Sequence, residues 1–247
     1  MKISIITVCY NSAATIEKTI LSVAGQTYSD IEYIIVDGNS KDGTVALIKK
    51  HEDKITKWIS EPDQGLYDAM NKGIAMATGD IVGILNSDDT FYAITVITEI
   101  AAFHAANTIE ASVGTIIQHK ENGKIIRNYS SKYWTPEKLK IGFMPPHPSL
   151  FFKRELFQKY GNYELGFTIG ADYELITRFF LKHGIAWKYS KVTTTAMLVG
   201  GLSSSGSASY HLITKEIQKA LQMNGVLFSS FKIKMRFIWK IVGFLKK

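Results

Sequence analysis

The chain has 247 residues, of which 46% are hydrophobic and 21% charged, and this ordinary globular composition excludes a disordered or collagen-like protein. Its length fits one or two domains. The net charge of +7 is uneven, because residues 226–247 contain six positive side chains and no acid, whereas the first 225 residues contain 23 positive and 22 acidic ones. A near-neutral body with a basic end argues against a general nucleic-acid binder, so we expect no nucleic-acid partner.

The first 90 residues alternate short apolar strands with helices. The expected strands are residues 3–9, 31–36, 55–60 and 81–85, and the expected helices are residues 14–24, 44–51 and 68–77. This alternation is typical of βαβ units and predicts an α/β protein with a mostly parallel central sheet flanked by helices. Ligands of such sheets bind beyond the carboxyl ends of the strands, where Asp37 and the pair Asp88-Asp89 fall.

The second half is less regular. The expected elements are a hairpin of residues 112–118 and 124–129, an apolar run at 149–152, a helix at 172–183 and a flexible loop at 200–206. The Asn122-Gly123 pair between the hairpin strands is typical of a tight turn. Prolines on both sides of His147 predict an extended segment there.

Cys9 is the only cysteine, so an intrachain disulfide and a secreted, disulfide-stapled fold are excluded. The apolar start of the chain runs into Tyr10 and Asn11 without a small-residue cleavage site, which indicates a buried strand rather than a signal peptide. No run of 18 uncharged apolar residues occurs, so no membrane-spanning helix is expected. These observations predict a cytoplasmic protein.

Asp88 and Asp89 are adjacent carboxylates directly after a buried strand. Such carboxylates repel each other and persist where a cation or a donor-rich ligand compensates them. Oxygen ligands suit Mg²⁺ or Mn²⁺ bridging a diphosphate. The alternative is an ordinary turn in which the aspartate caps a helix that begins at Thr90.

Three further residues have both a structural and a functional interpretation. Asp37 precedes a glycine and suits an Asx turn. Asp172 begins a helix and suits an N-cap, although a carboxylate that projects into a cleft also serves as a general base. His147 is either structural or a contact to a phosphate or a metal.

Five segments are more specific together than any one alone. They are residues 7–11 (TVCYN), 35–44 (IVDGNSKDGT), 63–73 (DQGLYDAMNKG), 85–89 (LNSDD) and 171–175 (ADYEL). Over roughly residues 1–205 this series resembles family 2 glycosyltransferases of the GT-A fold, which is Rossmann-like. It looks most like the bacterial branch that builds polysaccharides, including O-antigen (lipopolysaccharide) and capsule repeat units.

The resemblance implies a donor site in the first half. Tyr10 would lie against the nucleotide base, Asp37 would accept a hydrogen bond from a uracil-type ring nitrogen, and Asp63 would make a polar contact to the nucleotide. Asp88 would face the ribose or the water shell of the metal. Asp89 would be the protein ligand of a divalent ion, Mn²⁺ or Mg²⁺.

The resemblance also implies the reaction. Asp172 matches the general base that deprotonates the acceptor hydroxyl, while the metal neutralises charge on the leaving nucleoside diphosphate. Direct displacement then inverts the anomeric centre. We expect a hexose donor, UDP-galactose or UDP-glucose, and an acceptor sugar linked to polyprenyl pyrophosphate.

Three features depart from the family pattern. Asn86-Ser87 stand where the first acid of the DxD-type motif is usual, so the metal site rests chiefly on Asp89. Met70 stands where many relatives have an arginine, which leaves Lys72 as a candidate diphosphate contact. The Gln/Arg-x-x-Arg-Trp signature of processive synthases is missing, which favours transfer of one sugar per encounter.

The resemblance sets expected domain bounds. Residues 1–205 form the transferase domain, with a nucleotide-binding half to about residue 110 and an acceptor half over residues 111–205, and residues 206–247 form a helical basic tail. His147 and His211 are further candidate contacts to the metal or the diphosphate. The sequence leaves the oligomeric state open.

The tail predicts an amphipathic helix. Its apolar stripe is Phe228, Phe231, Met235, Ile238, Val242 and Leu245, and its basic row is Lys232, Arg236 and Lys240. Such a helix either packs on the body or lies in a membrane interface with the basic row at anionic headgroups. We expect the second, because the expected acceptor is lipid-linked, and so place the protein at the inner face of the cytoplasmic membrane.

Other classes fit less well. A sugar-nucleotidyl transferase needs a glycine-rich, basic loop after the first strand, where this chain has Tyr10-Asn11-Ser12. A dinucleotide-binding oxidoreductase needs G-x-G-x-x-G there. A degenerate transferase that acts as a sugar-binding or scaffold subunit needs Asp89 or Asp172 to be misplaced.

Overall fold

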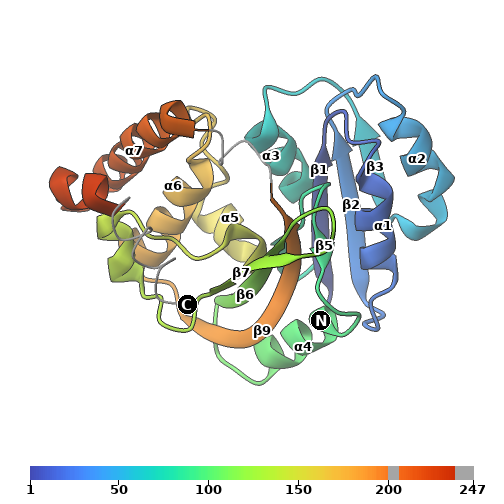
Figure 1. Ribbon diagram of the computed structural model, residues 1–247. Helices are drawn as coiled ribbons and strands as arrows, with labels where there is room; N and C mark the ends of the chain where they lie inside the picture. The colour runs from blue at the N-terminus through green and yellow to red at the C-terminus, as the bar shows by residue number, and fades with distance from the viewer. Residues whose placement is uncertain (200–205, 237–247) are drawn as a thin grey trace. The chain divides into compact units, whose positions relative to one another are not determined.

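The computed structural model describes residues 1–199 and 206–236 (Figure 1). The described residues form two compact units. Unit 1 contains residues 1–132, 145–163 and 186–199, and unit 2 contains residues 133–144, 164–185 and 206–236. These units are defined by contacts and interleave along the chain, whereas the expected domain bounds follow motifs, and those bounds stay a prediction.

Unit 1 is built on a mixed sheet in the order β3-β2-β1-β4-β8-β6-β9-β5, with β7 paired to β6. Its strands are β1 (Ile3–Cys9), β2 (Ile31–Asp37), β3 (Lys57–Ser60), β4 (Ile81–Ile84), β5 (Thr90–Phe91), β6 (Ala111–His119), β7 (Ile125–Ser130), β8 (Leu150–Lys153) and β9 (Trp187–Leu198). The pairs β1–β2, β1–β4 and β2–β3 are parallel, and β8 is antiparallel to both β4 and β6. The α/β class is confirmed. The first four strands form the main parallel part of the sheet, and β6 and β9 are a further parallel pair.

Helices cover both faces of the parallel part, which is why β1 is buried along its whole length. The helices of unit 1 are α1 (Ile16–Ala24), α2 (Thr44–Lys50), α3 (Leu66–Met76), α4 (Val96–Ala105) and α5 (Glu155–Tyr160). Ile3 and Ile5 share a core with Ile20 of α1 on one face. Ile6 meets Gly73 of α3 on the other, so closely that a Cβ on Gly73 would lie 2.4 Å from Ile6 Cγ2.

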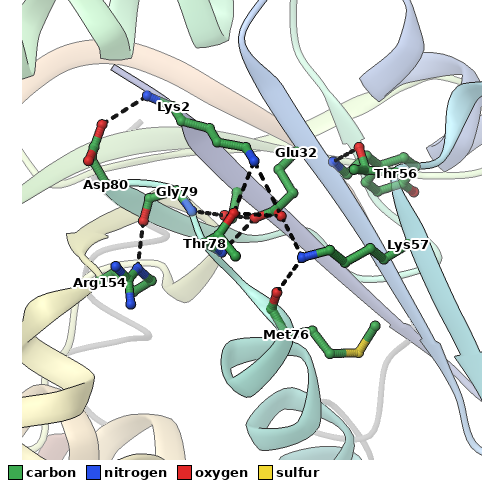
Figure 2. Close-up of polar contacts among 11 residues, drawn as sticks. Lys2, Glu32, Thr56, Lys57, Met76, Thr78, Gly79, Asp80 and Arg154 are labelled. Atoms are coloured by element: carbon green, nitrogen blue, oxygen red, sulfur yellow. Dashed lines mark hydrogen bonds and ion pairs between the residues drawn. The ribbon is translucent and has the colours of Figure 1, made fainter.

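A buried acid joins the strands at the edge opposite their carboxyl ends (Figure 2). Glu32 in β2 accepts hydrogen bonds from Ser4 Oγ in β1 (2.6 Å), from the backbone N–H of Thr78 (2.7 Å) and from Lys57 Nζ in β3 (2.9 Å). Burial disfavours the charged form, but these donors outweigh it and hold the pKa of Glu32 well below its usual range. The cluster therefore fixes β1, β2 and β3 on one another and is structural.

Some predicted elements differ from the structure. No helix begins at Thr90, because residues 90–91 are strand β5, paired with β9, so the helix-cap alternative for the aspartate pair is wrong. The hairpin of β6 and β7 is confirmed, with Gly123 at φ 77° in its turn. In unit 2, the expected helix at 172–183 is α6 (Ala171–Thr177) followed by a π-helical turn (Arg178–Lys182). The expected loop at 200–206 lies outside the described residues except for residue 206, which begins α7 (Gly206–Met223).

Unit 2 corrects the predicted orientation of the tail helix. Residues 230–236 are helical, but Arg236 is only 2% exposed rather than facing outward. Its Nη2 donates to Thr214 Oγ1 of α7 (3.2 Å), and its guanidinium lies 5.1 Å from the centre of the Tyr210 ring. Ile233 is also buried, whereas Phe231 of the predicted apolar stripe is exposed. This part of the tail therefore packs through the face that the helical pattern had assigned to solvent or lipid.

The rest of the predicted stripe and basic row, from residue 237 on, lies outside the described residues. Within the described ranges, every helix is too short or too polar to cross a membrane.

Candidate functional site

The carboxyl ends of β1, β2 and β4 carry the predicted donor-site residues. Cys9 pairs with Asp37 across the parallel strands, so Tyr10 and Gly38 follow side by side. Asp88 and Asp89 follow β4, the other parallel neighbour of β1. The structure thus confirms that these residues lie at one edge of the sheet.

The loops after β1 and β2 are joined by hydrogen bonds. The N–H of Asn11 donates to Ser40 Oγ (2.7 Å), and the N–H of Lys41 donates to Asn11 Oδ1 (2.9 Å). The N–H of Ala13 donates to Asp42 Oδ2 (2.9 Å). Asn11 has φ 49°, a conformation that asparagine tolerates better than most residues. The loops support each other, so this edge of the site is preformed.

Asp37 lies beneath this edge rather than at its surface. Its side chain is fully buried, and Oδ1 accepts a hydrogen bond from Ser40 Oγ (2.5 Å). Oδ2 accepts from Ser60 Oγ (2.6 Å) and from the N–H of Ser40 (3.0 Å). A carboxylate enclosed in this way closes its own turn, which is the structural alternative that the sequence left open.

Asp63 and Tyr10 form the accessible part of the same edge. A Cβ on Gly38 would lie 2.4 Å from Asp63 Oδ2 and 3.4 Å from Tyr10 Cδ2, so the carboxylate occupies the space above the glycine, beside the ring. Tyr10 is 64% exposed. Asp63 Oδ1 accepts the N–H of Gly65 (2.8 Å), which fixes the carboxylate. An exposed aromatic ring beside a hydrogen-bond acceptor suits a planar heterocycle with an N–H donor.

Lys72 holds the loop that carries Asp63. Its Nζ lies 2.8 Å from Glu61 Oε1 and donates to the carbonyl of Pro62 (2.8 Å). The hydrogen bond to Glu61 raises the pKa of Lys72. Met70, at the position where relatives have arginine, is buried in the core. The structure thus gives Lys72 a part in shaping the loop, and a contact to a diphosphate stays a prediction.

Asp89 is a buried acid without a basic partner among the described residues. It is 1% exposed, and its Oδ1 has no hydrogen-bond partner within the described chain. Burial and the neighbouring charge of Asp88 raise its pKa to about 8. The exposed Asp88 lies next to it.

This pair fits a divalent cation, because a cation would compensate both carboxylates and give the unpaired oxygen a ligand. The described residues contain no cluster of three or more His, Cys, Asp or Glu side chains able to hold a metal. The two aspartates would therefore leave most coordination positions to oxygens from elsewhere.

The contacts of His147 favour a structural role over a contact to a phosphate or a metal. Its Nε2 lies 2.7 Å from the hydroxyl of Tyr163, within a small apolar pocket that Leu150 and Phe152 help to line. Burial lowers the pKa of His147 to about 4, so the ring is neutral at pH 7 and offers no charge to a phosphate. Tyr163 in turn exchanges backbone hydrogen bonds with the side chain of Asn71 in α3 (2.8 and 2.9 Å).

Asp172 and His211 lie in unit 2. Asp172 is half-buried in the first turn of α6, and its Oδ1 accepts the N–H of Tyr173 (2.7 Å). The N-cap position of α6 is Gly170, so Asp172 is not the cap that the sequence allowed. His211 is exposed on α7, edge-on to Tyr210 with ring centres 5.9 Å apart.

Solved structures share this fold. The chain superimposes with a TM-score of 0.71 on residues 1–349 of TarS from S. aureus in complex with UDP-GlcNAc, at 19% identity over 96% of this chain and 72% of that one. It spans 39% of another TarS chain. The mannosyltransferase PcManGT from Pyrobaculum calidifontis, in complex with GDP-Man and Mn²⁺, gives a TM-score of 0.64 at 19% identity over 95% and 68% of the chains. These likenesses confirm the GT-A class of fold.

The sequence comparisons then give the family. A model described as glycosyl transferase family 2 matches residues 4–168, and the chain belongs to this family. A glycosyltransferase of Mycobacterium tuberculosis, described as uncharacterized, is 34% identical over 181 residues, 71% of this chain and 68% of the relative. A PGL/p-HBAD biosynthesis glycosyltransferase of Mycobacterium bovis is 28% identical over 90% of this chain and 84% of the relative. The protein is a glycosyltransferase, which decides against the nucleotidyltransferase and oxidoreductase alternatives.

Proposed function

We propose that the protein transfers one hexose per encounter from a nucleoside diphosphate sugar to a hydroxyl of an acceptor saccharide, with inversion at the anomeric centre. The observation that carries this proposal is the grouping of Tyr10, Asp63, Asp88 and Asp89 beyond the carboxyl ends of the parallel strands. The fold's solved neighbours include complexes with UDP-GlcNAc and with GDP-Man.

Donor recognition begins at the base. Tyr10 offers a stacking face, and Asp63 supplies the acceptor for a ring N–H, while the buried Asp37 keeps the loop in shape. This assignment moves the base-reading role from Asp37 to Asp63. We favour a uracil base, with UDP-galactose or UDP-glucose as the donor.

Asp89, with Asp88 beside it, is the proposed site for Mn²⁺ or Mg²⁺ on the donor diphosphate. A divalent ion bound there supplies positive charge that stabilises the leaving nucleoside diphosphate. Asp89 would hold the ion through its Oδ1, which has no hydrogen-bond partner among the described residues. Asp88 would face the ribose or the ion's water shell.

Asp172 is the proposed general base. An aspartate in its ionised form can accept the proton of the attacking hydroxyl. The N–H of Tyr173 holds Oδ1, which orients the carboxylate. Attack by the deprotonated hydroxyl displaces the diphosphate in one step, and this accounts for inversion.

The donor assignment is tested by Asp63→Asn and Asp37→Asn. Asn at position 63 puts an amide in place of one acceptor oxygen, so we expect about a tenfold to hundredfold loss of affinity for UDP, measured by titration calorimetry, with the melting temperature almost unchanged. Asp37→Asn is expected to lower the melting temperature, because it removes an acceptor inside a buried turn. Equal UDP affinity of D63N and wild type would contradict the assignment to Asp63.

A donor screen completes the test. UDP-galactose, UDP-glucose, UDP-GlcNAc, UDP-GalNAc and GDP-mannose, each radiolabelled, are offered with pyrophosphate-lipid acceptors that carry GlcNAc or GalNAc. We expect transfer from one of the first two. Transfer from GDP-mannose alone would overturn the proposed base preference.

The proposed acceptor is a sugar on polyprenyl pyrophosphate in bacterial surface polysaccharide assembly, met at the inner face of the cytoplasmic membrane. The relative from Mycobacterium bovis carries a name that places it in PGL/p-HBAD biosynthesis. Lys232 and Lys234 are exposed beside the buried Arg236, and Lys240, Lys246 and Lys247 follow in the sequence. These five lysines supply the charge for anionic lipid.

Charge reversal tests membrane binding better than truncation, because truncation would also remove the buried Ile233 and Arg236. We expect K240E/K246E/K247E to lose most binding to vesicles containing 30% anionic lipid, since each basic residue near such a surface contributes about 1 kcal/mol. The matched control is K18E/K49E/K124E, which changes the net charge equally at exposed lysines of unit 1. Equal vesicle binding by both triple variants would refute the tail as the anchor.

A further inference from the structure

Glu216 of α7 is a buried carboxylate that accepts three consecutive backbone N–H groups. Its Oε1 accepts from Thr168 (2.7 Å), and its Oε2 accepts from Ile169 (3.0 Å) and from Gly170 (2.7 Å). The side chain is 7% exposed. Hydrogen bonds to a charged acceptor are stronger than neutral ones, so this contact fixes the path of residues 168–170.

The fixed segment leads directly into the helix that carries Asp172. Gly170 is the residue before α6, and Asp172 is the second residue of that helix. Glu216 approaches so closely that a Cβ on Gly170 would lie 3.1 Å from both its Cβ and its Oε2. The position of the Asp172 backbone is therefore set two residues upstream by a side chain from another helix.

A second contact holds α6 beyond Asp172. The side chain of Asn224, at the end of α7, donates to Glu174 Oε1 (3.0 Å), and Glu174 is paired with Arg178 (2.7 Å). The end of α7 thus holds α6 at Glu174, and Glu216 holds the segment before it. Asp172 lies between these two contacts, so the backbone is held in place on both sides of it.

We propose that Glu216 is a positioning residue for the general base, and that its contact with the N–H groups of residues 168–170 sets the reach of the Asp172 carboxylate. This inference rests on the proposed function, in which Asp172 accepts the proton of the acceptor hydroxyl. A general base has to meet its proton within hydrogen-bond distance, so a shift of about 1 Å in its backbone costs up to about a hundredfold in rate.

The test is Glu216→Gln, which keeps the volume but turns an amide N–H toward backbone N–H groups. We expect kcat to fall about tenfold to hundredfold, while the KM for the donor and the affinity for UDP stay at wild-type values. The matched control is Glu32→Gln, because Glu32 is also a buried acid with several donors but lies in unit 1. We expect E32Q to lower the melting temperature and to leave kcat unchanged at a temperature where it is folded.

The double variant E216Q/D172N separates positioning from a general structural effect. If Glu216 acts through Asp172, then E216Q lowers the residual turnover of D172N no further, whereas independent roles give additive losses. Full kcat in E216Q, or additive losses in the double variant, would overturn the inference. Undiminished turnover of D172N alone would instead overturn the proposed function. If E216Q does not fold, Gly170→Ala replaces it, because the added Cβ displaces the same carboxylate.

Discussion

Asp89→Asn is expected to lower kcat by about a thousandfold or more in the presence of Mn²⁺, and its residual turnover is expected to be insensitive to EDTA. The reason is the unpaired Oδ1 of Asp89, which is the one buried carboxylate oxygen without a partner among the described side chains. The measurement is initial rate of transfer from the UDP-sugar, with and without EDTA. The exposed Asp53→Asn serves as the control and should behave as wild type.

The same substitution is expected to raise the stability of the protein while it lowers the activity. Asp89 is buried beside the charge of Asp88, so its ionised form costs folding free energy when no cation is bound. D89N should therefore melt at a higher temperature than wild type in EDTA, and added Mn²⁺ should raise the melting temperature of wild type only. Wild-type turnover that is undiminished in EDTA, or a D89N enzyme with full activity, would contradict the metal assignment.

Asp172→Asn is expected to reduce turnover by about a hundredfold to ten-thousandfold and to leave UDP affinity unchanged, since an amide cannot accept the proton of the acceptor hydroxyl. The volume and the contact with the N–H of Tyr173 are kept, because the Asn side-chain oxygen is also an acceptor. Kinetics at saturating donor measure the first effect, and calorimetry with UDP measures the second. Glu164→Gln, an exposed acid of the same unit, is the control.

Two results would separate the interpretations of Asp172. Lost UDP affinity in D172N would make Asp172 part of the donor site rather than the base. Undiminished transfer would remove it from the chemistry altogether. If wild type, D89N and D172N all showed no measurable transfer, the result would support a degenerate transferase that acts as a scaffold, which the sequence also allowed.

The first half of the fold could be predicted because its signals are local. Residues 3–9 and 31–36 are mostly apolar and rich in isoleucine and valine, and such runs are typical of strands that helices cover on both faces. β5 could not be found in this way, because its two residues are a strand only through pairing with β9, about 100 positions away. β9 itself carries serine and threonine along its length, and Lys191 at φ 65° interrupts its regular backbone.

The site was predicted in outline, because each parallel strand ends at the same edge. The sequence could not predict which of the site's side chains are buried and which are exposed. Asp37 and Asp63 are both aspartates next to turns, and only Ser40, Ser60 and the missing side chain at Gly38 decide which carboxylate is enclosed. The position of a residue in a motif therefore predicts where in the fold it lies, whereas its burial decides whether it can contact a ligand.

The contacts within unit 2 are even harder to predict from the sequence. A helical pattern shows that residues 230–236 have two faces, but the partners that choose between them, Thr214 and Tyr210, are some 20 residues away. Glu216 binds only backbone N–H groups, and backbone donors are present in every sequence. No residue pattern near 168–170 points to it.

The close approach at Gly38 has a consequence for variation among relatives. Because the Asp63 carboxylate fills the space that any side chain at position 38 would need, the two positions are expected to change together. If an aspartate stood at position 38 and a small residue at position 63, the proposed base-binding oxygen would come from the loop after β2 instead of the loop after β3. Exchanging the pair, as Gly38→Asp with Asp63→Gly, should therefore be tolerated where Gly38→Asp alone is not, which would make these two positions one exchangeable determinant of nucleotide choice.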